Sequence, residues 1–580
     1  MTLVSGLRKR QEAAHLGSDR LSNPGALDRS NRGRYSLEQP TLREASWLGI
    51  SRFSEGIAFA HRVGPALDEK GSLMARRSVT VLLFIGCSFA LSATAEAQLL
   101  PLFRRSQQMD RDTNPEHEQK KTQAQSAYQG GDFPKTIELM DAVLKENPRD
   151  PVAYYLRGSA RVDLGARTFD AKLVRDGVAD AREAIRFDTQ QTSLYYLPYL
   201  FGMKSLATLE NRKDHAQTAV DQATLVLGRP TLKEDERANL LYQRAQAEAW
   251  LGKNDEAIND LQEGLRLTPS HFGARATLAD VYVKSGKNAE ALAAFNKLVE
   301  LFPENPLSLN NRGMYLQNQG KFDDAIVDFT RAIERDPNYF VAYANRGFTL
   351  LQMENPTAAE TDFTQSLRIN PQQAFVYNLR AQAKIAKGDA AGAIKDQQAA
   401  VELSPKDPVA LGDLGFVLSF ADDYAGALAP LDAALAIDPE FKHLNPWRIV
   451  ALQRLGKTNG LKDQFKESLS KDIKLRTWVD HLIAYLLGAE SEGQLLAAAQ
   501  TAKEPLKTDQ TCEASYFIGL TRAGAGKTSE AADMFQRALS TKSRQLSAYR
   551  GAQLALKKLN PGADKSGSAS VPSAIAPASK

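Results

Sequence analysis

The sequence has little of what catalytic and metal centres are built from. Among its 580 residues there are two cysteines, Cys87 and Cys512, and seven histidines. Two cysteines cannot supply a disulfide framework or a zinc ligand set, and no two histidines have the HxxxH or HExxH spacing of a helical metal site. No GxSxG segment is present either. The sequence therefore indicates no catalytic residue, no cofactor and no metal site.

A large excess of charge is also absent. Lysine and arginine number 73 against 69 aspartate and glutamate residues, which leaves a net charge of +4. A nucleic-acid-binding chain would show a basic stripe or patch, so we expect no nucleic-acid partner. Hydrophobic residues at 43% and charged residues at 24% are ordinary for a folded protein. A chain of this length exceeds one simple core, so several domains or a repeat array are expected.

One segment, residues 74–97, carries a long apolar run. Arg76 and Arg77 precede an apolar stretch from Val79 to Leu91, and Ala95-Glu96-Ala97 fits a small-x-small cleavage site. This order is typical of a secretory signal peptide, which predicts an exported, periplasmic or secreted protein.

The position of this segment leaves alternatives open, because 73 residues precede it. In one interpretation, Met74 is the true start and residues 1–73 are not translated. If residues 1–73 are translated, their composition predicts a disordered leader. If Met1 is the start, residues 79–97 form a signal anchor of about 19 residues, close to the ~20 that span a bilayer. A third interpretation places a lipid on Cys87, which follows Gly86 as in a lipobox. The membrane is then contacted only through an uncleaved or lipidated N-terminal anchor.

Prolines recur with a strict period of 34 residues in the middle of the chain. They are Pro269, Pro303, Pro337, Pro371, Pro405 and Pro439. With each proline set at position 32, they define six repeats, 238–271, 272–305, 306–339, 340–373, 374–407 and 408–441. Because proline ends a helix, each repeat is expected to close a helical unit.

Other positions of the repeat are equally regular. Position 8 is alanine or glycine in all six repeats, position 20 is always alanine, and position 15 is glycine in four (Gly252, Gly286, Gly320, Gly388). Small side chains allow two antiparallel helices to cross closely, and glycine suits the tight connection between them. A single hairpin cannot bury its apolar face, whereas stacked hairpins can.

This pattern closely resembles the tetratricopeptide repeat. The resemblance implies an all-α, right-handed superhelical solenoid of stacked antiparallel helix hairpins. Weaker copies extend it, so we expect degenerate repeats over 117–237, regular repeats over 238–441 and degenerate repeats again over 442–557. The tail at 558–580, rich in Pro, Ser, Ala and Gly, is expected to be disordered. No stretch of about 100 residues remains for a catalytic domain, so an enzyme is not expected.

Arginine at position 7 occurs together with aspartate at position 23. The pairs are Arg244 with Asp260, Arg312 with Asp328, Arg346 with Asp362, and Arg380 with Asp396. Where position 7 is leucine, at Leu278 and Leu414, position 23 is Ala294 or Pro430. Joint presence and absence predict an ion pair between the two helices of a repeat, because a buried charge needs its partner. A ladder of arginines that binds an anion is the alternative.

The resemblance also implies where a partner binds. In this family the first helix of each repeat lines a concave groove through positions 2, 5, 6, 9 and 13. Here these positions include Tyr242, Asn310, Asn311, Asn345, Phe348, Gln352, Asn378, Gln382 and Phe416. Amides can bond an extended backbone and aromatic rings can anchor apolar side chains. The expected partner is a protein or peptide, and the expected role is a non-enzymatic interaction scaffold in the bacterial cell envelope, soluble or membrane-anchored.

Overall fold

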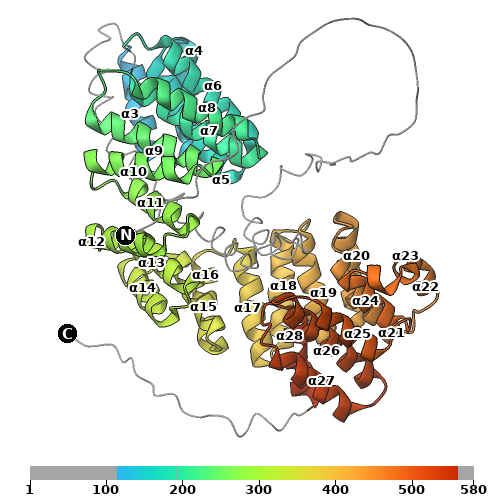
Figure 1. Cartoon of the computed structure of the whole chain (residues 1–580). Helices are drawn as coiled ribbons and strands as arrows, with labels where there is room; N and C mark the ends of the chain where they lie inside the picture. The colour runs from blue at the N-terminus through green and yellow to red at the C-terminus, as the bar shows by residue number, and fades with distance from the viewer. Residues whose placement is uncertain (1–113, 191, 560–580) are drawn as a thin grey trace, which may run out of the picture. The chain divides into compact units, whose positions relative to one another are not determined.

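The computed structural model describes residues 114–190 and 192–559, and all regular secondary structure in these ranges is helical (Figure 1). The prediction of an all-α fold is confirmed. The predicted leader, signal segment and most of the C-terminal tail lie outside the described residues.

The helices follow one another as hairpins, each with a first and a second helix. Up to residue 301 they are α3 (Pro115–Gln129), α4 (Phe133–Glu146), α5 (Pro151–Thr168), α6 (Ala171–Phe187), α7 (Tyr196–Glu210), α8 (Lys213–Leu227), α9 (Glu234–Leu251), α10 (Asn254–Leu267), α11 (Phe272–Lys284) and α12 (Asn288–Leu301). The following hairpins up to residue 437 are α13 (Pro306–Asn318), α14 (Phe322–Arg335), α15 (Phe340–Gln352), α16 (Pro356–Ile369), α17 (Ala374–Lys387), α18 (Ala390–Leu403), α19 (Pro408–Phe420) and α20 (Tyr424–Ile437).

The C-terminal part is less regular. Its helices are α21 (Asn445–Arg454), α22 (Leu461–Gln464), α23 (Lys466–Ser470), α24 (Trp478–Leu486), α25 (Glu492–Thr501), α26 (Leu506–Gly524), α27 (Thr528–Ser540) and α28 (Ser547–Leu559). Three short 3₁₀ turns, η1 (Ser193–Tyr195), η2 (Lys442–Leu444) and η3 (Ile473–Leu475), lie between helices.

Neighbouring helices pack on one another along the chain. Each hairpin packs within itself, as α13 does on α14, and its second helix packs on the next first helix, as α14 does on α15. First helices of adjacent hairpins also meet, as α13 with α15 and α15 with α17. Contacts of this kind are those of a solenoid, in which each unit is stabilised by its neighbours.

Proline and glycine fix the ends of the helices in the regular repeats. Each second helix ends two residues before its proline, as α14 does before Pro337 and α16 before Pro371. Position 15 has a positive φ throughout, for example 73° at Gly320 and 92° at Gly388. Glycine adopts this left-handed conformation without steric cost, so it ends the first helix and turns the chain into the second.

The small residue at position 8 faces a large one at position 24. A Cβ on Gly347 would lie 2.9 Å from Cε1 of Phe363, and one on Gly313 would lie 2.8 Å from Cε1 of Phe329. Both phenylalanines are fully buried. Position 24 is Leu261 opposite Ala245, but it is Phe295 opposite Ala279, so alanine and phenylalanine also occur together at this crossing. A glycine or alanine at position 8 therefore lets the two helices of a hairpin approach closely.

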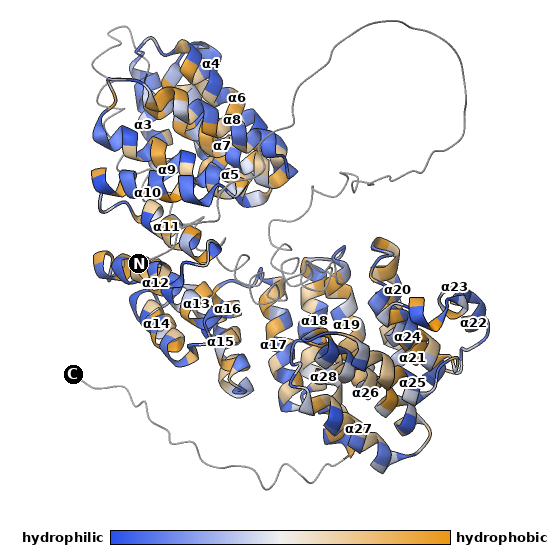
Figure 2. Ribbon diagram, in the orientation of Figure 1, coloured by the Kyte–Doolittle hydropathy of each residue, from blue (hydrophilic) through white to orange (hydrophobic). Residues whose placement is uncertain are grey.

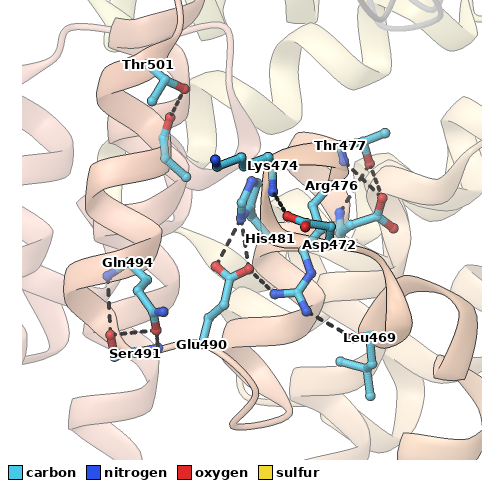
Figure 3. A network of polar contacts seen from close by, with 12 residues as sticks. Leu469, Asp472, Lys474, Arg476, Thr477, His481, Glu490, Ser491, Gln494 and Thr501 are labelled. Carbon is cyan, nitrogen blue, oxygen red and sulfur yellow. Dashed lines mark hydrogen bonds and ion pairs between the residues drawn. The ribbon is translucent and has the colours of Figure 1, made fainter.

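The irregular segment between α22 and α25 is held by a buried polar network (Figure 3). Glu490 has a side chain with no exposure and accepts from both Arg476 and Nδ1 of His481, at 2.9 Å for the histidine. Nη2 of Arg476 also donates to the carbonyl of Leu469 at 3.0 Å. In this segment, hydrogen bonds and ion pairs between polar side chains hold the chain in place, whereas apolar packing between hairpins does so in the regular repeats.

The largest apolar cluster joins the last regular repeats to the degenerate C-terminal repeats. Hydrophobic and hydrophilic residues alternate around most helices (Figure 2), as amphipathic packing requires. The largest core cluster runs from Ala381 in α17 to Leu554 in α28. Within the described residues, no helix has the length and apolar character needed to cross a bilayer.

Candidate functional site

Each predicted arginine is joined to its aspartate by two hydrogen bonds. Nε and Nη2 of Arg346 lie 2.8 Å from the two carboxylate oxygens of Asp362. The equivalent distances are 2.6–2.7 Å for Arg244 with Asp260, 2.7 Å for Arg312 with Asp328, and 2.6–2.9 Å for Arg380 with Asp396. Bidentate geometry of this kind is among the strongest charge-assisted contacts. These arginines bind carboxylates of their own repeat.

The same arginines also reach the preceding hairpin. Nη1 of Arg346 donates to Oγ1 of Thr330 at 3.0 Å, and Nη1 of Arg312 donates to Oδ1 of Asn296 at 3.1 Å. Arg448, beyond the regular repeats, also contacts the preceding hairpin, because its Nε lies 2.5 Å from Oδ1 of Asp432 on α20. The sequence pattern shows the pair within the repeat, but it does not show this bond between hairpins.

The amides predicted for the groove connect successive first helices. Nδ2 of Asn345 donates to Oδ1 of Asn310 at 2.9 Å, and Asn378 donates to Asp413. Each bond joins residues 35 apart, that is, position 5 of one repeat and position 6 of the next. Nε2 of Gln382 in turn donates to Oδ1 of Asn378 at 2.6 Å. The structure thus joins these side chains in two separate sets, one between α13 and α15 and one between α17 and α19.

The nine predicted groove residues differ in exposure. Tyr242, Asn310, Asn311, Asn345 and Phe416 are buried, whereas Phe348, Gln352, Asn378 and Gln382 are half-buried. Tyr242 packs against His271 with ring centroids 4.9 Å apart, and Phe416 packs against Trp447 at 4.7 Å. The half-buried four are the ones whose surfaces remain partly accessible, and their role in binding a partner stays a prediction.

Three half-buried carboxyl groups on first helices accept hydrogen bonds in the same 35-residue steps. Asp163 accepts from Tyr128, Asp413 from Asn378, and Glu513 from Nε1 of Trp478 at 2.6 Å. Burial raises the pKa of Asp163 and Asp413 to about 6, and that of Glu513 to about 7. These acids were not predicted, although an acid 35 residues after a donor is a signal that the sequence does contain.

The last helix of the described chain lies on first helices of the array. Besides its neighbours α26 and α27, α28 packs against α17 and α19. Burial lowers the pKa of Arg550 in this helix, against the opposing charge of Asp413 on α19. Part of the first-helix surface is therefore covered by a segment of the same chain.

Comparison with known families decides the identity of the fold. Tetratricopeptide-repeat families match residues 121–167, 242–306, 306–339, 329–361 and 376–407. The chain is a tetratricopeptide-repeat protein. All the matched families are tetratricopeptide repeats, and such proteins generally serve as scaffolds for protein interactions.

Solved tetratricopeptide-repeat structures are similar to parts of this protein. PilF of Pseudomonas aeruginosa is 22% identical over 37% of this chain and 98% of its own, with a TM-score of 0.32. A tetratricopeptide-repeat protein from Parabacteroides merdae is 18% identical over 53% of this chain and 100% of its own, with a TM-score of 0.30. YrrB, described as having an unusual peptide-binding site, is 17% identical over 31% and 92%, with a TM-score of 0.27. No curated protein matches in sequence.

Features of this tetratricopeptide-repeat protein that resemble reactive sites have structural explanations. Cys512 is fully buried, and burial raises the pKa of its thiol to about 12, so it is not a nucleophile at neutral pH. The segment from Gly524 to Thr528 partly matches a phosphate-binding loop, but it is the end of α26, a three-residue turn and the start of α27. No group of three or more potential metal ligands occurs in the described ranges.

The raised pKa of Glu513 predicts a pH-dependent stability gain for the substitution Glu513→Gln. Because the folded state holds the proton more tightly, the glutamate destabilises the protein increasingly as pH rises from about 4.5 to about 7. Glutamine keeps the acceptor for Trp478 without the charge, so it should add about 1–2 kcal/mol at pH 8 and clearly less at pH 5. Urea denaturation at both pH values measures this, with exposed Glu530→Gln as control. A gain that is equal at both pH values would contradict the assignment.

Proposed function

We propose that this protein binds polypeptide segments of partner proteins along the inner face formed by its first helices. The observation that carries the proposal is the position of α28, a stretch of polypeptide that packs on first helices α17 and α19. A surface that accommodates one segment of chain has the shape and chemistry to accommodate another. The half-buried amides of Gln352 and Gln382 add hydrogen-bonding groups, and the half-buried ring of Phe348 adds an aromatic anchor.

A binding measurement with a generic unfolded polypeptide tests this function. Fluorescently labelled, reduced and carboxymethylated α-lactalbumin is titrated with the full chain, and anisotropy is followed. Phe348→Ala should weaken binding about 10-fold, the effect of losing one aromatic anchor worth about 1–2 kcal/mol. The control is Val327→Ala, which removes a half-exposed apolar side chain from the second helix α14. Equal affinities of the two variants, or no binding by the wild type, would count against the proposal.

We further propose that the protein acts outside the cytoplasm, in the cell envelope. The support is the segment from Arg76 to Ala97, which has the order and chemistry of a signal peptide. Cleavage would yield a soluble product that begins at Gln98. The alternative is a membrane-anchored protein, held by residues 79–97 or by a lipid on Cys87. Cell fractionation with salt and detergent washes, followed by mass spectrometry of the mature N-terminus, distinguishes the two.

A further inference from the structure

The segment that carries α28 is attached to three successive hairpins through three basic side chains. Nη1 of Arg544 donates to the carbonyl of Gln352 at 3.0 Å. Nζ of Lys557 donates to the carbonyl of Ala386 at 3.1 Å, and Nζ of Lys558 to that of Phe420 at 2.5 Å. The three acceptors are 34 residues apart, so they occupy the same position, 13, of the repeats that begin at residues 340, 374 and 408.

The chemistry of these acceptors follows from the fold. Position 13 lies at or next to the end of each first helix, at the end of α15, α17 and α19. The last carbonyls of a helix lack intrahelical donors and carry the negative end of the helix dipole. Stacked repeats therefore present a row of electronegative groups at a fixed interval, and suitably spaced cations can bind along it.

Two of these three hairpins add a carboxylate where the fold favours glycine. Position 15 is glycine in four of the six regular repeats, but it is Glu354 and Asp422 in the others. Both acids have a left-handed backbone, with φ of 62° and 63°, which is strained for a residue with a Cβ. Glu354 forms an ion pair with Arg544, and Asp422 forms one with Lys558 at 2.5 Å. The two departures from glycine thus coincide with contacts to the docked segment.

The body of α28 fits the surface through small residues. A Cβ on Gly551 would lie 2.6 Å from the hydroxyl of Tyr516 and 2.7 Å from Cε1 of Phe420. Ala548, one turn before Gly551, and Ala552, the next residue, are buried. Phe420 and Tyr516 both pack against Trp447, so the surface under Gly551 is a cluster of aromatic rings. A helix needs glycine or alanine on this face to approach so closely.

We propose that the hairpins at 340–441, with Trp447 of α21 and Tyr516 of α26, form a binding site for a basic helix with a small-residue face, and that α28 is its intramolecular ligand. A partner that presents such a helix must displace α28 to bind there. The class of partner rests on the proposed function, whereas the docking of α28 rests on its own contacts. The ion pairs of Glu354 and Asp422 are more than half exposed on the acidic side, so they are weak and screened by salt. High ionic strength therefore weakens the docking of α28.

Two full-length variants separate the ligand from its site. Arg544→Glu, Lys557→Glu and Lys558→Glu together release α28 and leave the site intact. Glu354→Lys with Asp422→Lys releases α28 and disables the site. In both, amide hydrogen exchange of residues 547–559 should be at least 10-fold faster than in wild type. The control is Asp255→Lys with Glu304→Lys, two exposed acids on other hairpins, which should leave this exchange unchanged.

A labelled peptide of residues 543–559, added in trans, completes the test. It should bind the first variant at least 10-fold more tightly than wild type, and it should show no such gain with the second. Gly551→Leu, which blocks docking without a change of charge, should gain peptide binding like the first. Unchanged exchange in both charge variants, or equal peptide binding by both, would overturn the proposal. The proposed function would be unaffected, because it is tested separately, by the affinity of Phe348→Ala for labelled α-lactalbumin.

Discussion

Asp362→Ala should lower the free energy of unfolding by about 2–3 kcal/mol, because it leaves the guanidinium of Arg346 without its carboxylate. Asp362 is 7% exposed and Arg346 is 22% exposed, so neither charge is well hydrated in the folded state. Burial and the loss of both 2.8 Å hydrogen bonds act in the same direction. Urea denaturation of the full chain measures the change, with exposed Asp323→Ala as the matched control.

A double-mutant cycle tests whether the pair acts as a unit. Arg346→Leu with Asp362→Ala reproduces the combination found at Leu278 and Ala294, where the fold uses no charges. The double variant should therefore cost less than the sum of the single substitutions, with a coupling energy of about 1–2 kcal/mol. A coupling energy of zero would favour the alternative in which these arginines bind an external anion.

Gly347→Val should destabilise the protein by about 2–3 kcal/mol through overpacking at the helix crossing. The added Cβ would lie 2.9 Å from Cε1 of Phe363 and 3.2 Å from the carbonyl of Ala359. Phe363 is fully buried, so its ring has no open space to enter. Thermal and urea unfolding measure the loss of stability. Gly320→Ala is not a suitable control, because the positive φ at this position would strain an alanine for a different reason.

A matched substitution shows whether the size of the side chain at position 8 is the cause. Gly347→Ala reproduces the natural pair of Ala279 with the fully buried Phe295. We expect this variant to lose clearly less stability than Gly347→Val, because the chain already packs a methyl group against phenylalanine at this crossing. Equal losses of stability in the two variants would show that overpacking is not the cause.

The regular repeats were predictable because the same residue types recur at the same positions of each 34-residue unit. Proline ends each second helix, glycine permits the left-handed turn, and a small residue at position 8 marks the crossing. Each of these requirements involves residues within one 34-residue unit, so a single repeat contains the whole signal. The covariation of position 7 with position 23 is readable for the same reason, as with Arg346 and Asp362.

The docking of α28 was not predictable from the period. Arg544 and Gln352 are 192 residues apart, and nothing in a 34-residue repeat encodes a contact at that distance. The sequence contains only indirect signs, namely acids instead of glycine at Glu354 and Asp422. The network of Glu490, His481 and Arg476 was missed likewise, because it replaces repeat packing with side chains that follow no register.

The groove residues fall between these two cases. The family positions lie on first helices, but they do not show which amides bond to one another. Asn310 and Asn345 are buried and joined by a hydrogen bond, whereas Phe348 and Gln352 are half-buried. The 35-residue step follows from the packing of adjacent first helices, a geometry that the 34-residue period alone does not specify.

Site-specific photo-crosslinking in living cells tests most directly whether the inner face binds partner proteins. A photoreactive phenylalanine analogue replaces Phe348 on first helix α15, and in a second strain it replaces Val327 on second helix α14. We predict a discrete crosslinked protein partner from position 348 and none from position 327. Crosslinking from position 327 alone would contradict the account, because the partner would then be bound by the opposite face of the hairpins.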